Sequence, residues 1–114
     1  MAEIISSEQD GIHHLKLIGE IDAGSSVDLD QAIGKCAAAG ARQLIIDCSQ
    51  LEYISSAGLG VFMSYVEEFQ ENRVRMILHS LRDRVAHTFQ LLGLADMLII
   101  VQTPEEALQR IHEK

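Results

Sequence analysis

The sequence predicts an α/β fold, a mixed but largely parallel sheet of about five strands with about four helices. In the second half of the chain, short apolar runs rich in β-branched residues alternate with segments whose apolar residues recur at helical spacing. The helical segments follow serine, threonine or aspartate residues, which are suited to capping. Alternation of strands and helices implies right-handed crossovers onto parallel strands.

The first elements predicted are two strands. Residues 3–7 and 12–18 have tendencies toward alternating apolar and polar positions, and the polar stretch 8–11 between them reads as a turn. Together they form a plausible opening hairpin. Residues 19–24, which include two glycines, are predicted to be a loop.

A helix follows this loop. Ser25 and Asp28 have the spacing of a capping box, and Gly40 is the expected end of the helix. The buried face of the helix is predicted to carry Leu29, Ala32, Ile33, Cys36 and Ala37.

The centre of the chain predicts a buried strand, a serine-containing turn and a second helix. Residues 44–48 form the strand, and Ser55 and Ser56 occupy the turn. The first turn of a helix leaves backbone N–H groups unpaired and carries the positive end of the helix dipole. Ser56 can therefore serve either as a helix cap or as an acceptor of phosphate, and the residues alone leave both roles open. The apolar face of this helix is predicted to carry Leu59, Phe62, Met63, Val66 and Phe69.

The C-terminal part predicts two further strand–helix units. Residues 75–79 form a strand, and Ser80 and Asp83 introduce a helix with Val85, Phe89 and Leu92 inward, closed by Gly93. Residues 97–101 form the last strand. Thr103, Pro104 and Glu106 then combine a cap, a proline at the first helical position and a capping-box glutamate.

Composition limits the classes of function. The 114 residues are expected to form one domain, 1–114, and the net charge of −8 disfavours nucleic acid and anionic lipid as partners. The apolar runs are too short to span a bilayer and the N-terminus does not resemble a signal peptide, so we expect a cytoplasmic protein without direct membrane binding. The two cysteines, Cys36 and Cys48, are expected to be reduced core residues.

The sequence offers little support for an enzyme. A serine hydrolase would need a nucleophile elbow around Ser56, but Ile54 stands where its first glycine belongs. His13 and His14 are adjacent on a predicted strand, so they point to opposite faces and cannot share a metal ion. We therefore predict no catalytic residues, no metal site and no cofactor.

Two aspartates are candidates for a site near the serines. Asp22 and Asp47 follow or end predicted strands, on the sheet edge where α/β proteins usually bind ligands. Either carboxylate could instead cap a local turn, and the sequence leaves both roles open. A receiver domain is a further α/β alternative, but the acidic pair and the late lysine typical of that class are missing.

The chain resembles the bacterial anti-sigma-factor antagonists, which are small single-domain STAS proteins. The resemblance covers nearly the whole chain and rests on segments 17–22, 44–47, 51–60 and 91–94, above all Gly-Glu-Ile-Asp at 19–22 and Ser-Ser-Ala-Gly-Leu-Gly at 55–60. It implies that Ser56 is the phosphorylated residue and that Asp22 lies near it. Ser55 replaces the acid that many members have beside the phosphosite, which makes Ser55 a second candidate acceptor, and Ala57 replaces a hydroxyl.

The resemblance also implies a mechanism. The unmodified protein would bind an anti-sigma factor that is also a serine protein kinase and so release the sigma factor. Phosphorylation of Ser56 would block binding, and a PP2C-type phosphatase would reset the cycle. The implied partner-binding residues are Asp22, Ser25, Ser55, Ser56, Ala57, Gly58, Gly60 and Ser64. The alternative is a non-catalytic STAS subunit of a larger complex, such as a lipid-transport ABC assembly, that uses the same surface without phosphorylation.

Overall fold

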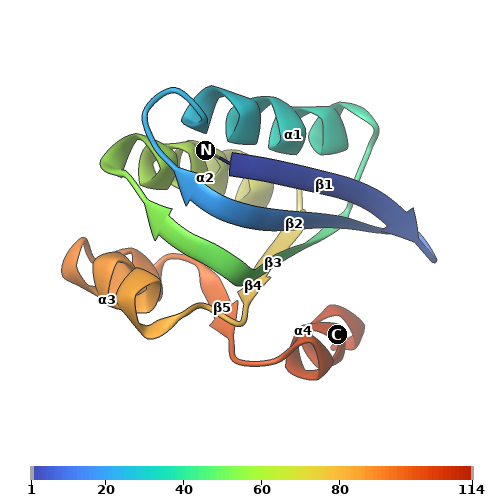
Figure 1. Cartoon of the computed structure of the whole chain (residues 1–114). Coiled ribbons are helices and arrows are strands. Elements are labelled where there is room, and N and C mark those ends of the chain that lie inside the picture. The colour runs from blue at the N-terminus through green and yellow to red at the C-terminus, as the bar shows by residue number, and fades with distance from the viewer. Residues whose placement is uncertain (1, 114) are drawn as a thin grey trace.

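The structure is a computed structural model that describes residues 2–113. Five strands and four α-helices alternate much as the sequence predicts, with one short 3₁₀ turn added (Figure 1). In chain order the elements are β1 (Ala2–Gln9), β2 (Ile12–Ile21), α1 (Ser26–Ala38), β3 (Gln43–Ile54), α2 (Ser56–Glu71), β4 (Arg75–His79), α3 (Asp83–Leu91), η1 (Leu94–Asp96), β5 (Ile99–Val101) and α4 (Pro104–His112).

The sheet has the spatial order β1-β2-β3-β4-β5. β1 and β2 are antiparallel, and every later pair is parallel. Figure 1 shows α1 and α2 on one side of the strands and α4 on the other. This arrangement confirms the predicted mixed, largely parallel α/β sheet, and it places helices on both faces of that sheet.

The opening hairpin is longer and its turn tighter than predicted. Only Asp10 and Gly11 lie outside the strands, and both have positive φ, at 53° and 81°. A two-residue turn with positive φ at both positions matches the twist of the flanking strands, and Asp-Gly is a preferred pair for it. β1 and β2 therefore pair from Ala2 opposite Gly19 to Gln9 opposite Ile12.

Two strands extend beyond their predicted ends. The prediction of a loop over 19–24 is wrong for its first half, because β2 continues to Ile21. Gly19 has a φ of 91°, and the pairing with β3 shifts register between Gly19 and Glu20, so the strand absorbs the glycine as an irregularity. β3 likewise continues past 48 to Ile54.

The main core lies between the sheet and helices α1, α2 and α3. Leu15, Leu44, Leu78 and their neighbours on alternate strand positions face it, and Phe62 and Phe89 meet with ring centroids 6.1 Å apart. Cys36 and Cys48 are buried in the same cluster as free thiols, as expected for core cysteines. The predicted inward faces of α1 and α2 are confirmed at their central positions, Leu29, Ile33, Leu59, Phe62 and Phe69.

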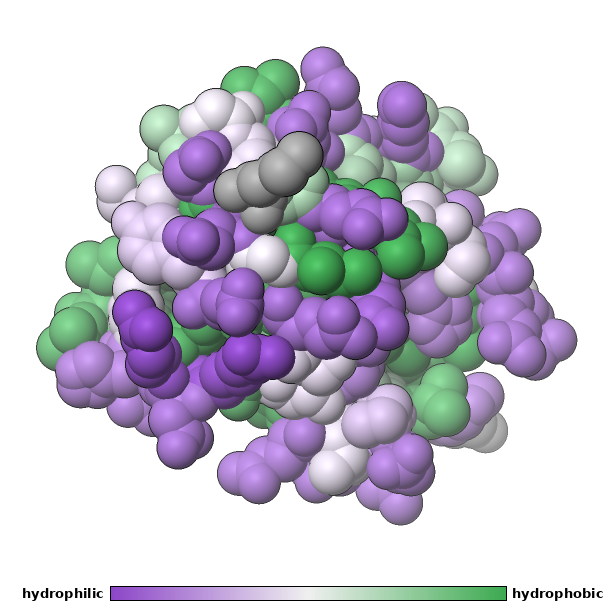
Figure 2. Space-filling view, viewed as in Figure 1, coloured by the Kyte–Doolittle hydropathy of each residue, from purple (hydrophilic) through white to green (hydrophobic). Residues whose placement is uncertain are grey.

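A smaller apolar cluster lies on the opposite face of the sheet under α4. It consists of Ile12, Ile45, Ile77, Val101, Ala107 and Ile111. Figure 2, viewed as in Figure 1, shows mainly hydrophilic side chains over the β1 side of the molecule, with apolar atoms among them. Ile5 on β1 is 45% exposed, so α4 does not cover this part of the face.

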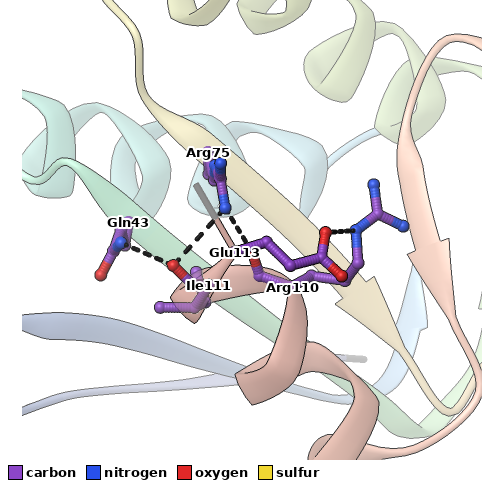
Figure 3. Close-up of polar contacts among 5 residues, drawn as sticks. All are labelled: Gln43, Arg75, Arg110, Ile111 and Glu113. Carbon is purple, nitrogen blue, oxygen red and sulfur yellow. Dashed lines mark hydrogen bonds and ion pairs between the residues drawn. The ribbon is translucent and has the colours of Figure 1, made fainter.

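Polar contacts hold the C-terminal end of α4 against the sheet (Figure 3). The Arg75 guanidinium donates to the carbonyls of Arg110 and Ile111, and the Gln43 side-chain amide donates to the Ile111 carbonyl at 3.3 Å. The last carbonyls of a helix have no partner within it and form its negative end. Arg75 on β4 and Gln43 on β3 therefore close this end of α4.

The helix boundaries near the C-terminus confirm one predicted cap and correct another. Thr103 caps α4 by accepting from the Glu106 N–H at 3.1 Å, with Pro104 as the first helical residue. Ser80 does not introduce α3: its φ is 63°, and the helix begins at Asp83 after Arg82. Leu92 is 55% exposed rather than inward, because the helix ends at Leu91 and Gly93, with φ 73°, turns the chain away.

Two structural features of residues 2–113 bear on function. None of the helices there is long and apolar enough to cross a bilayer. In the same residues, no three His, Cys, Asp or Glu side chains are placed to hold a metal ion together.

Candidate functional site

The carboxyl ends of β2 and β3 lie side by side. Ile21 and Ile54 are register partners, and the Ser55 N–H donates to the Ile21 carbonyl at 2.8 Å. The chain continues from these two ends into Asp22 and Ser56. The structure therefore brings Asp22 next to the serine turn, as the parallel topology predicts.

The two serines of the turn have different environments. Ser55 is the N-cap of α2, with extended backbone, and its Oγ accepts from the Gly58 N–H at 3.3 Å. Ser56 is the first residue of α2 and is exposed. Among residues 2–113, no partner forms a hydrogen bond with the Ser56 hydroxyl, and the N–H groups of Ser56 and Ala57 are also unpaired. The cap is Ser55, which leaves the Ser56 hydroxyl free.

The two glycines of the turn also differ. A Cβ on Gly58 would lie 2.7 Å from Ile54 Cγ1 and 3.0 Å from Ile21 Cγ2, so only glycine lets α2 start this close to the strand ends. A Cβ on Gly60 would meet nothing within 4 Å. Gly58 is thus required by packing, while Gly60 lies on an open surface of the helix.

Asp22 and Ser25 form the cap that precedes α1. The Asp22 N–H donates to Ser25 Oγ and the Ser25 N–H to Asp22 Oδ1, both at 2.9 Å, and the Ser26 N–H reaches the Asp22 carbonyl at 2.9 Å. The predicted capping box of Ser25 with Asp28 is wrong, because the reciprocal pair lies three residues earlier. The Ser25 N–H, followed by its hydroxyl, lowers the pKa of Asp22, so the exposed carboxylate remains charged.

The remaining predicted docking residues follow one exposed stripe of α2. Ala57, Gly60 and Ser64 are spaced at helical intervals and are all exposed, and the Ser64 hydroxyl donates to the Val61 carbonyl at 2.7 Å. Glu67 and Glu71 continue the stripe. The α2 sequence contains three glutamates and no Lys or Arg, so this surface is acidic.

Two apolar side chains beside this site were not predicted from the sequence. Val27, the second residue of α1, is 55% exposed, and Tyr53, one residue before the end of β3, is 45% exposed. Exposed apolar side chains next to polar groups are typical of protein–protein contact surfaces. Both fall outside the buried periodicity of their elements, and this departure is the signal that could have found them.

The prediction that Asp47 belongs to this sheet edge is wrong. Asp47 lies in the middle of β3, because the strand runs on to Ile54, and it is the register partner of Lys16 and His79. Its Oδ1 accepts from the Ser49 N–H at 2.9 Å, a local turn-type contact. The Asp47 pKa is lowered, with burial opposing the hydrogen bonds from Ser49 and the charges of His79 and Lys16.

The arrangement is suited to docking and to acceptance of a phosphate. Within residues 2–113 no histidine or carboxylate is hydrogen-bonded to the Ser56 hydroxyl. The unpaired N–H groups at the start of α2 and the positive end of its dipole favour an anion on Ser56. A flanking surface of Asp22, Ala57 and Ser64 is open for a partner.

The chain is similar in sequence to a known domain family and to named proteins. The STAS domain model matches residues 3–107. The anti-sigma-B factor antagonist of Listeria monocytogenes serovar 1/2a is 30% identical over 82 residues, which is 72% of each chain. The anti-sigma-B factor antagonist of Staphylococcus aureus (strain NCTC 8325 / PS 47) is 24% identical over 102 residues, covering 90% of this chain and 94% of the relative.

Solved structures share the fold. The anti-sigma factor antagonist from Mycobacterium paratuberculosis superposes with a TM-score of 0.90 at 24% identity, covering 99% of this chain and 96% of that one. SpoIIAA in its unphosphorylated form gives 0.80 at 23% identity, with 96% of each chain covered. The Bacillus cell fate determinant SpoIIAA in its phosphorylated form gives 0.73 at 22%, covering 96% of this chain and 100% of that one. With a domain match over nearly its whole length, the chain belongs to the STAS domain family.

Proposed function

We propose that this protein is an anti-sigma factor antagonist whose binding is switched by phosphorylation of Ser56. Two relatives that cover most of the chain are named anti-sigma-B factor antagonists, and the fold neighbour SpoIIAA is known in unphosphorylated and phosphorylated forms. One observation carries the assignment to Ser56. Its hydroxyl is exposed and unbonded within the described residues, because Ser55 caps the helix.

The unphosphorylated protein docks on an anti-sigma factor through the surface around Asp22, Ser25 and the α2 stripe. The anti-sigma factor is itself a serine protein kinase that holds the sigma factor. When this protein docks on it, the anti-sigma factor releases the sigma factor. The kinase transfers the γ-phosphoryl group of its own ATP to Ser56 Oγ, the hydroxyl proton passes to a base of the kinase, and ADP leaves. A PP2C-type phosphatase hydrolyses the phosphate ester and restores the docking form.

Phosphate at Ser56 would oppose docking without unfolding the protein. It adds about 1.5 to 2 negative charges and sits at a helix start that favours an anion. The partner must then accommodate this bulky, strongly hydrated group in the centre of the contact, beside the Asp22 carboxylate, and burying it there costs more than long-range charge attraction returns. In this cycle the protein is a ligand and a substrate in the cytoplasm, and catalysis belongs to its partners.

Substitutions at Ser56 test the proposal. The protein is tagged in its own cells, and the anti-sigma factor that co-purifies is identified and purified. Ser56→Ala should bind this kinase in the presence of ATP and resist phosphorylation. Ser56→Asp should bind at least about tenfold more weakly, because a carboxylate in the centre of the contact must give up its water there. Thermal unfolding of Ser56→Ala should match wild type, since Ser56 makes no side-chain hydrogen bond there. Ser56→Asp should be at least as stable as wild type, because its carboxylate lies at the positive end of the α2 dipole.

Two matched controls complete the test. Ser55→Ala removes the cap, so it should lower stability by about 1 kcal/mol while leaving Ser56 phosphorylation intact. Ser64→Ala changes a neighbouring hydroxyl on the same helix and should still be phosphorylated. Phosphate found on Ser55, or a Ser56→Asp variant that binds as tightly as wild type, would contradict the switch and favour a STAS subunit that docks constitutively.

A further inference from the structure

The part of the sheet that α4 leaves uncovered carries an unusual row of side chains. Ile5 pairs with Lys16, Lys16 with Asp47, and Asp47 with His79, so one residue from each of β1 to β4 lines up across the sheet. Register partners project to the same face. This face is the one on which Ile45 and Ile77 contact α4, and it is opposite to the main core.

A hollow of about 340 Å³ opens over this row. It is bounded by β1, by the row itself and by the first residue of α4, and the side chains that matter are Ile5, His14, Lys16, Asp47, His79 and Pro104. Its volume is at the lower end of the range of about 300–1,000 Å³ typical of small-molecule sites. The hollow thus combines two apolar walls with several groups that can form hydrogen bonds.

Lys16 is left without an ionic partner in spite of its register. Across residues 2–113, no carboxylate lies within 4.0 Å of the Lys16 ammonium, although Asp47 is directly opposite it on β3. Asp47 instead uses Oδ1 to accept the Ser49 N–H. An ammonium without a carboxylate partner, on a side chain that lines a hollow, is a donor that an anion from outside could satisfy.

The two histidines add ring nitrogens on the same wall. His79 is only 5% exposed, and its Nδ1 lies 2.7 Å from Ser80 Oγ, while its Nε2 has no hydrogen-bond partner within the described residues. His14, two residues from Lys16 on β2, has no side-chain hydrogen bond within those residues either. Lys16 and His14 therefore border the hollow with donor capacity to spare, while His79 Nδ1 donates to Ser80 Oγ, whose own proton goes to the Gln102 carbonyl.

We propose that this hollow binds a small monocarboxylate, with its carboxylate on Lys16 and His14 and its apolar part between Ile5 and Pro104. The Asp47 carboxylate on the same wall disfavours a second negative charge, so a singly charged carboxylate fits better than a phosphate dianion. The site lies on the face of the sheet opposite α1 and α2 and extends the function beyond docking of a protein partner.

NMR titration of the full chain with butyrate tests the site. The amide resonances of Ile5, His14, Lys16, His79 and Glu105 should shift and saturate, with a Kd on the order of 1 mM given the small, open hollow. Lys16→Gln should weaken binding at least about tenfold, since it removes the charge that holds the carboxylate. Lys35→Gln, on α1 behind the sheet, is the matched control and should bind as wild type does.

Titrations with two other small molecules, inorganic phosphate and butylamine, test the chemical preference of the hollow. Inorganic phosphate at the same ionic strength should shift these amides less than butyrate does, and butylamine should leave them unmoved. Shifts that grow linearly without saturation, or that persist unchanged in Lys16→Gln, would overturn the proposal. Equal binding of phosphate would overturn the preference for a single charge. Because none of these residues belongs to the docking surface, the outcome is independent of phosphorylation at Ser56.

Discussion

At the scale of single residues, neighbours in the serine turn differ in how strongly the fold constrains them. Ser55 closes the start of α2 through the Gly58 N–H, while Ser56 contributes an unbonded hydroxyl. Gly58 permits close packing against Ile21 and Ile54. The same four-residue stretch therefore contains positions that the fold requires and positions that it leaves free.

Substituting alanine for Gly58 and for Gly60 should distinguish a position that the fold requires from one that it leaves free. Gly58→Ala should destabilise the protein by about 1–3 kcal/mol, because its methyl group would clash with Ile54 and Ile21. Gly60→Ala should stabilise it by about 0.5–1 kcal/mol, since the methyl meets nothing and the helix gains propensity. Urea unfolding of the two variants measures both effects. Equal losses would show that the close contact at Gly58 does not constrain the helix.

His79 should make stability depend on pH in mildly acidic solution. Burial lowers the pKa of His79 below its ordinary 6.5, with the charge of Asp47 opposing and His14 reinforcing the shift. The unfolded chain then takes up the proton more readily, so the free energy of unfolding should fall as pH drops below about 6.5. The pKa values of Asp22 and Asp47 are lowered from 3.8, so these two carboxylates change the free energy of unfolding only near or below pH 3.8, outside this window.

Denaturant unfolding at pH 7 and pH 5 checks this dependence. Replacing His79 by Gln removes the titrating ring and should flatten the fall between the two pH values. His87→Gln, at an exposed position of α3, should retain it. The expectation fails if both variants lose stability as steeply as wild type.

At the scale of elements, contacts far apart in sequence hold the helices in place. Tyr65 on α2 donates to the Asp30 carbonyl on α1 at 3.1 Å, which ties the two helices that flank the docking surface. Burial, followed by the neighbouring Asp30 carboxylate, raises the pKa of Tyr65 to about 12. Arg75 and Gln43 hold α4 in a similar way (Figure 3).

Removal of the Arg75 guanidinium should loosen α4. Arg75→Met keeps much of the apolar stem and leaves the Arg110 and Ile111 carbonyls without this donor, so the free energy of unfolding should fall by about 1 kcal/mol. Hydrogen exchange should quicken most at the C-terminal amides of α4. Arg73→Met is the control, because the Arg73 side chain makes no hydrogen bond or ion pair within residues 2–113, and uniform acceleration in both variants would contradict the local role.

Local sequence patterns predicted most of this architecture. Thr103 with Glu106 marked the start of α4, and the apolar spacing around Phe62 marked α2, because capping and periodicity act within a few residues. The patterns failed where pairing with a neighbouring strand decided the outcome. β2 and β3 run on through Gly19 and Ser49 because each is the other's partner, and this displaced Asp47 from the expected edge.

At the scale of the whole molecule, charge is unevenly distributed along the chain. Residues 1–72 contain three Lys or Arg against twelve Asp or Glu, a net charge of −9, whereas residues 73–114 contain six against five, a net charge of +1. The docking surface belongs to the acidic part. A partner that docks there should present a basic surface, and charge attraction should speed its approach.

Docking should therefore slow as salt is added. Raising NaCl from about 50 to about 300 mM should reduce the association rate constant several-fold, since screening shortens the reach of surface charge. Glu67→Gln with Glu71→Gln should lower the rate at low salt and weaken this dependence. Glu3→Gln with Glu8→Gln, on β1, is the matched change in net charge. Surface plasmon resonance with the purified anti-sigma factor measures all three proteins, and identical salt slopes would refute steering through α2.

The division between Ser55 and Ser56 has a consequence for how such a protein can evolve. Because the helix cap and the free hydroxyl are separate residues, a mutation at 56 can abolish or mimic modification while the fold keeps its N-cap. Lineages can then gain or lose regulation by a single codon change that carries little folding penalty. A single substitution at position 56 can thus produce a descendant that always binds its partner or never does. Regulation of this kind can therefore change in evolution with little loss of stability.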